Sequence, residues 1–84
     1  MENVFNTSDM ASIAVLITVG YKVISLKKTQ PGKTVFSFAD DGQIQKILNR
    51  YWAKDLNVSA RDFFENIKMI KTRMSQTNLT NDHE

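Results

Sequence analysis

The first long apolar stretch, ASIAVLITV at residues 11–19, fits both a helix and a strand. β-branched residues alternate at positions 13, 15, 17 and 19, which is typical of a strand. Ser8 and Asp9 are favoured N-cap residues, however, and Gly20 suits a helix end. Because alanine and leucine occupy the positions between, we predict a helix over residues 8–19. It lacks a polar face, so it must be covered on most sides.

Two β-rich runs follow, at residues 21–28 and 34–38, joined around Gln30-Pro31-Gly32-Lys33. Proline fixes φ at the second turn position, and glycine tolerates the positive φ that a type II turn needs at the third. The runs therefore predict a two-stranded antiparallel hairpin. In its second strand, Phe36 and Phe38 share the face that we expect to meet the core. In the first, Ile24 and Leu26 alternate with Val23 and Ser25.

Two amphipathic helices are predicted after the hairpin. One begins near Asp40 and Asp41, whose carboxylates can cap free N–H groups. Its inward face follows the helical spacing Ile44, Ile47, Leu48 and Tyr51. After a short break at residues 56–58, Ser59 opens the last helix, in a sequence that approximates a capping box. The buried stripe of that helix is Phe63, Ile67, Ile70 and Met74, with Phe64 alongside.

These elements predict an α+β fold in the order α-β-β-α-α, a two-stranded antiparallel hairpin packed against three helices. Two strands alone are marginally stable, so helices must cover the apolar face of the hairpin. A chain of 84 residues makes one domain. We place that domain at residues 8–75. The polar segments 1–7 and 76–84 are predicted to be flexible ends.

The composition offers little for catalysis or for holding a cofactor. The chain has no cysteine, and its one histidine, His83, lies in the C-terminal segment, so a zinc site lacks ligands. No serine has an evident base, and three scattered glycines make no phosphate-binding loop. We predict no enzymatic activity, no catalytic residue, no metal and no cofactor. Stability must then come from packing or from self-association, so a homo-oligomer is possible.

Location follows from the same features. The apolar run at residues 11–19 is too short for a bilayer, which needs about 20 residues, and acidic rather than basic residues precede it. Lack of cysteine fits a reducing compartment. We expect a soluble cytoplasmic protein without a membrane partner.

A run of cations in QKILNRYWAKDL, residues 45–56, is the best candidate for a binding surface. Lys46, Arg50 and Lys54 are four apart and would share one helical face, with Trp52 beside them. No acidic residue lies between Asp41 and Asp55 to neutralise them. Near the end of the last helix, Lys71 and Arg73 add positive charge. Trp52 either offers an exposed stacking platform or packs in the core against the hairpin.

Several stretches together resemble a known family. They are Gly-Tyr-Lys at residues 20–22, Val-Phe-Ser-Phe-Ala-Asp at 35–40, Arg-Tyr-Trp at 50–52, Val-Ser-Ala-Arg-Asp-Phe-Phe at 58–64 and Ile-Lys-Thr-Arg at 70–73. The chain resembles a family of short, uncharacterised proteins, described as a domain of unknown function, that is common in bacterial phages, prophages and plasmids. The resemblance implies the order of elements, a helix in the first segment and an origin in a mobile element. It implies no activity.

Three interpretations of the cationic run remain. Regularly spaced cations with an aromatic platform are typical of nucleic-acid binding, so we expect a non-enzymatic protein that contacts nucleic acid. Alternatively, the chain is a docking module or inhibitor that binds a host defence or replication protein, since tryptophan and arginine dominate interface hot spots. An ordinary solvated helix face explains the same cations without a partner.

Overall fold

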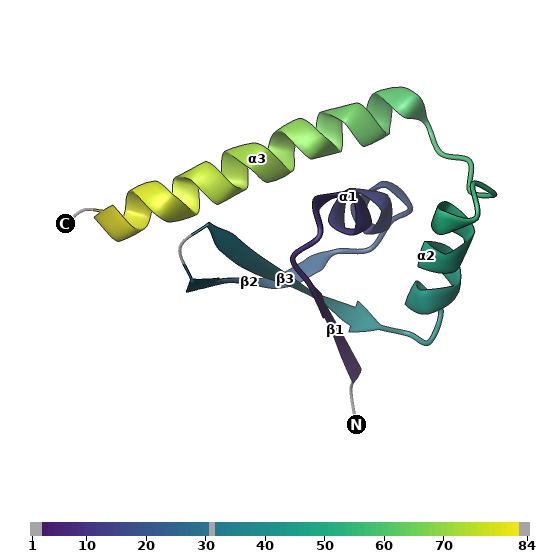
Figure 1. The fold of residues 1–84 in the computed structure, drawn as a ribbon, viewed down its shortest axis with the longest axis horizontal. Helices are drawn as coiled ribbons and strands as arrows, with labels where there is room; N and C mark the ends of the chain where they lie inside the picture. The colour runs from purple at the N-terminus through teal and green to yellow at the C-terminus, as the bar shows by residue number, and fades with distance from the viewer. Residues whose placement is uncertain (1–2, 31, 83–84) are drawn as a thin grey trace.

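In a computed structural model, the chain folds into a three-stranded antiparallel sheet and three helices (Figure 1). The structure describes residues 3–30 and 32–82. The α+β class and the three predicted helices are confirmed. In chain order the elements are β1 (Asn3–Thr7), α1 (Met10–Thr18), β2 (Val23–Gln30), β3 (Lys33–Asp40), α2 (Ile44–Trp52) and α3 (Ala60–Asp82).

The first strand corrects the predicted order. β3 is the central strand, paired with β2 on one side and with β1 on the other. The order α-β-β-α-α and the two-stranded sheet are therefore wrong in this detail, and residues 3–7 form a paired strand where a flexible end was predicted. The physical reason is the small apolar content of β1. Only Phe5, opposite Phe38, packs against the core from this strand, so its five residues resemble a polar terminus.

The hairpin is confirmed, but β2 is not a regular strand. Val23 pairs with Phe38 and Ser25 pairs with Ser37, so Ile24 is an extra, unpaired residue that forms a β-bulge. Such a bulge changes which side chains face the core. Val23 and Leu26 both pack inward as a result, whereas Ile24 is 54% exposed. At the turn, Gly32 has φ +80, the positive value predicted there, and Pro31 lies outside the described residues.

Helix α1 is the centre of the fold. It lies between the sheet and the long helix α3, with α2 at its side (Figure 1). Ile13, Ala14 and Leu16 have no exposed surface, as expected for a helix without a polar face. They form the core together with Val15, Phe36, Phe38, Ile44, Leu48 and Ile70. The inward faces predicted for β3 and for the last two helices are therefore confirmed, except that Phe64, predicted alongside the buried stripe of α3, is 62% exposed.

The ends of α1 are set by the residues that the sequence indicates. Asp9 is the N-cap, and its Oδ2 accepts hydrogen bonds from the backbone N–H of Ser12 at 3.0 Å and from the Ser12 hydroxyl at 2.8 Å. At the other end, Gly20 adopts φ +114, and the N–H of Tyr21 donates to the carbonyl of Leu16 at 2.9 Å. This is a Schellman ending, which glycine adopts without strain.

Helix α3 begins as predicted and extends further than predicted. The backbone N–H of Asp62 donates to the Ser59 hydroxyl oxygen at 3.2 Å, so Ser59 caps the helix. The helical backbone continues to Asp82, through most of the segment predicted to be a flexible tail. Residues 83–84 lie outside the described part of the chain, as do the side chains from residue 76 onward.

Candidate functional site

The predicted cationic run lies at and beyond the C-terminal end of α2. Lys46, Arg50, Trp52 and Lys54, which we call the α2 surface, are all exposed. Helix α2 ends at Trp52, so Lys54 is outside the helix, with φ 63. Lys46 and Arg50 are separated by about 40° around the helix axis and share one face. Lys54 does not extend that face as a third helical turn.

The end of α2 repeats the ending of α1 without a glycine. The N–H of Asp55 donates to the carbonyl of Arg50 at 2.8 Å, and the N–H of Lys54 donates to the carbonyl of Tyr51 at 3.0 Å. These two bonds define a Schellman motif whose left-handed residue is Lys54. The guanidinium of Arg50 also donates to the carbonyl of Asp55 at 3.1 Å. Arg50 therefore helps to close the helix end while its charge faces solvent.

Trp52 is an exposed residue. Its side chain is 67% exposed, which excludes the alternative that it packs in the core. The ring meets Tyr51 edge-to-face, with the two centroids 5.3 Å apart and the planes inclined by 68°. On the helix, Trp52 projects about 200° around from Arg50. It continues the polar flank of α2, where the side-chain amide of Gln45 donates to Asn49 at 3.1 Å.

The other two predicted site residues, Lys71 and Arg73, are exposed but are not part of the α2 surface. They belong to the C-terminal half of α3, which lies on the opposite side of the molecule from α2 (Figure 1). Being two residues apart, they project about 200° from each other. The fold thus separates the predicted cations into two groups.

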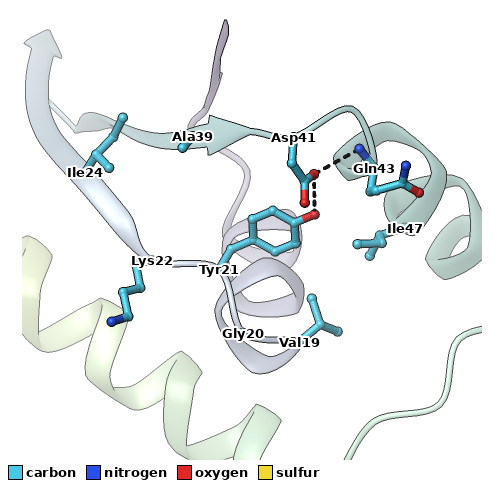
Figure 2. A pocket seen from close by; sticks show the side chains of 9 residues that line it. All are labelled: Val19, Gly20, Tyr21, Lys22, Ile24, Ala39, Asp41, Gln43 and Ile47. Carbon is cyan, nitrogen blue, oxygen red and sulfur yellow. Dashed lines mark hydrogen bonds between the residues drawn. The ribbon is translucent and has the colours of Figure 1, made fainter. Parts of the chain in front are cut away.

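A pocket that the sequence does not predict opens at one end of the sheet. Its volume is about 740 Å³, and five segments contribute to it. The loop after α1 supplies Val19, Gly20, Tyr21 and Lys22, the strands supply Ile24 and Ala39, the β3–α2 connection supplies Asp41 and Gln43, and α2 supplies Ile47 (Figure 2). Its walls are mainly aliphatic.

The polar end of this pocket is a hydrogen-bonded pair. The Tyr21 hydroxyl donates to Oδ1 of Asp41 at 2.7 Å, and the backbone N–H of Gln43 donates to the same oxygen at 3.0 Å (Figure 2). Partial burial, followed by the hydrogen bond to Asp41, raises the pKa of Tyr21 to about 12. The Tyr21 hydroxyl and the Gln43 N–H lower the pKa of the Asp41 carboxyl. At neutral pH the pair is a neutral tyrosine and a charged carboxylate.

Asp40 and Asp41 do not cap the helix as predicted, because α2 begins at Ile44 and its N-cap, Gln43, makes no side-chain capping hydrogen bond. Their carboxylates instead accept hydrogen bonds within the turn before the helix. Each carboxylate bonds the N–H two residues ahead, Asp40 to Gly42 at 2.9 Å and Asp41 to Gln43. The contact of Asp41 with Tyr21 was missed. Tyr21 follows the glycine that ends α1, a position that often carries an apolar contact, but its partner 20 residues away has no sequence signal.

Two further findings concern the described residues alone. No group of three or more His, Asp or Glu side chains there is arranged to hold a metal ion. No helix in the same part of the chain is long and apolar enough to cross a membrane.

The chain belongs to the family described as Domain of unknown function (DUF5659), whose model matches residues 2–76. This confirms the resemblance to an uncharacterised domain family and extends it over β1. Comparison with the curated proteins and with the solved structures finds no match.

Proposed function

We propose that this protein is a non-enzymatic binding protein that contacts single-stranded nucleic acid through the α2 surface. The observation that carries this proposal is the exposure of Trp52, 67%, at the end of a helix that contains cations and no acidic residue. Base stacking on an exposed aromatic ring is worth about 1–3 kcal/mol and tolerates any base sequence.

The cations supply the second part of the contact. Lys46 and Arg50 lie on one side of α2, Trp52 lies on the other, and Lys54 follows the helix end. A strand that crosses the end of α2 can place a base on the ring and phosphates near the cations. Lys71 and Arg73 belong to α3, whose C-terminal half lies on the opposite side of the molecule from α2 (Figure 1), so in this proposal they add to the general positive potential.

Origin and location are parts of the same proposal. We propose that the chain derives from a phage, prophage or plasmid and acts in the cytoplasm. The lack of cysteine supports a reducing compartment.

Salt dependence tests the electrostatic part. Neutralised phosphates release counterions, so three contacts give a log–log slope of affinity against salt of about −2 for a single strand. We expect Lys46, Arg50 and Lys54 changed together to Gln to remove most of that slope in fluorescence-anisotropy titrations with an oligonucleotide. The matched control changes Lys22, Lys27 and Lys33 to Gln, which alters net charge equally, and should keep most of the slope. If both variants lose the same part of the slope, net charge alone explains the salt dependence, and the α2 surface is not a defined binding site.

Trp52→Ala tests the stacking part. Because the ring is exposed, the variant should fold normally by circular dichroism while binding to single strands weakens by about 1–3 kcal/mol. Phe64→Ala is the matched control, since Phe64 is also an exposed aromatic residue, 62% exposed, on a different helix. It should bind as the wild type does. No binding by the wild-type protein at low salt would end the nucleic-acid proposal.

A protein partner is the second candidate, and the same exposed tryptophan favours it. Tryptophan and arginine are enriched in interface hot spots. Arg50 and Trp52 are both exposed at the end of α2. A host defence or replication protein, or a second copy of the chain, would be the partner. Affinity capture with and without nuclease separates the two candidates. A partner that survives nuclease and is lost in Trp52→Ala favours protein docking.

A further inference from the structure

The pocket beside Tyr21 has the size and lining of a small-molecule site. Such sites are usually about 300–1,000 Å³, mostly apolar, with a few polar groups that orient the ligand. This pocket, at about 740 Å³, has Val19, Ile24 and Ile47 in its walls. Ile24 is there because the bulge in β2 turns its side chain away from the core, which leaves an aliphatic group 54% exposed.

The polar end of the pocket offers acceptors. The hydroxyl proton of Tyr21 and the N–H proton of Gln43 are both directed to Oδ1 of Asp41. Oδ2 of that carboxylate and the lone pairs of the Tyr21 oxygen therefore keep their capacity to accept hydrogen bonds. A ligand that uses this end must bring its own donors.

The charge of Asp41 has no cationic partner within the described chain. Among the described residues, Lys22 lines the pocket but makes no ion pair with Asp41, and in Figure 2 its side chain extends away from the carboxylate. Asp40, next in the chain, adds negative charge close by. A negative potential at the end of an aliphatic hollow favours a positively charged group there over a neutral or negative one.

We propose that this pocket binds a small molecule in which an apolar body carries one protonated amine. The ammonium group donates to Asp41 Oδ2 and the Tyr21 oxygen, and the apolar body lies among Val19, Ile24 and Ile47. This site is separate from the α2 surface and does not depend on nucleic-acid binding.

Three probes of equal length test the chemistry. Hexylamine, hexanol and hexanoate share an apolar chain and differ in the head group. In titrations followed by amide chemical shifts, hexylamine should cause saturable shifts that centre on residues 19–24 and 39–47, with an affinity at least fivefold higher than that of hexanol. Hexanoate should bind most weakly. Equal binding of hexylamine and hexanol, or shifts spread over the whole protein, would overturn the proposal.

Matched variants locate the site. Asp41→Asn keeps an acceptor for Tyr21 and Gln43 but removes the charge, so hexylamine affinity should fall to that of hexanol. Asp55→Asn removes one negative charge from an exposed residue outside the pocket and should change affinity less than twofold. Ile24→Ser should weaken both hexylamine and hexanol. Unchanged hexylamine binding in Asp41→Asn would refute the assignment of the carboxylate.

One more variant separates this site from the proposed function. Lys46, Arg50 and Lys54 changed together to Gln should leave hexylamine binding intact. Loss of amine binding in that variant, with Asp41 unaltered, would mean that the pocket is not an independent site. Failure of nucleic-acid binding alone leaves the pocket proposal standing.

Discussion

Phe36 and Trp52 are both aromatic, yet they have opposite places in the molecule. Phe36 is 2% exposed and packs in the core, whereas Trp52 is 67% exposed. Truncating a buried phenylalanine removes burial and leaves a cavity, at a cost of about 3–5 kcal/mol. We therefore predict that Phe36→Ala either does not fold or has a free energy of unfolding, measured by urea denaturation, about 3–5 kcal/mol below that of the wild type. Trp52→Ala is its internal control and should stay within about 0.5 kcal/mol of the wild type.

The Tyr21–Asp41 pair makes a prediction about pH. The raised pKa of Tyr21, about 12, means that the folded protein holds the phenolic proton more tightly than the unfolded chain. Its contribution to stability is therefore complete below pH 10, the ordinary pKa, and is lost as pH rises toward 12. The contribution of Asp41 to stability depends on pH in the opposite direction. Its pKa is lowered, so its contribution is present at neutral pH and is lost as pH falls through the folded value.

Ultraviolet titration of the tyrosines measures the upper half of this behaviour. The wild-type protein should show one tyrosine ionising near pH 12. Tyr21→Phe should remove that component. Asp41→Asn should move it to lower pH, since the carboxylate charge and its acceptor both favour the protonated phenol. A late component that persists in Tyr21→Phe would belong to another tyrosine and contradict the assignment.

At the scale of elements, the two Schellman endings differ in one residue. Gly20 occupies the left-handed position after α1, and Lys54 occupies it after α2, at φ 63. A residue with a β-carbon loses about 1–2 kcal/mol in this conformation, whereas glycine does not. Glycine also gains freedom in the unfolded chain, which offsets part of that gain. We predict that Lys54→Gly stabilises the protein by about 0.5–1 kcal/mol in urea denaturation.

Lys54→Ala is the control that separates backbone strain from charge. It removes the ammonium group and keeps the β-carbon, so its free energy of unfolding should stay within about 0.5 kcal/mol of the wild type. If both variants are equally stable, strain at Lys54 is not what limits this helix end.

The elements that the sequence predicts are those with a strong local pattern. α2 and α3 have apolar residues at helical spacing, and both ends of α1 carry capping residues, so all three helices were predictable. β1 was not, because its pairing with β3 depends on residues 29 to 37 positions away and its own pattern has one core residue, Phe5. The bulge at Ile24 was hidden too, since simple alternation places Ile24 and Leu26 on one face.

At the scale of the whole molecule, candidate sites were predictable only where they are continuous in sequence. The cations of the α2 surface lie within nine residues, so their spacing was visible, although the helix end before Lys54 was not. The pocket is built from the loop after α1, both hairpin strands, the β3–α2 connection and α2. Its components are ordinary residues until the fold brings Tyr21 to Asp41, so no sequence pattern announces it.

The long C-terminal helix leads to the last prediction. Ile70 has no exposed surface and Met74 packs against the core, so α3 is anchored through this part of its length. Beyond it, Figure 1 shows the helix end projecting past the β2–β3 hairpin. Residues 76–84 contain one large apolar residue, Leu79, so the segment has little apolar surface with which to stabilise the domain.

We predict that truncation after Ser75 leaves a folded protein with a single cooperative unfolding transition and a stability within about 1 kcal/mol of the full chain. The matched control is truncation after Met69, which removes Ile70 and Met74 and should abolish that transition, because the core facing α1 loses a fully buried side chain. Thermal unfolding followed by circular dichroism distinguishes the two. If the protein truncated after Ser75 also loses its cooperative transition, the last turns of α3 stabilise the domain through contacts of their own. The domain boundary at residue 75 would then be wrong.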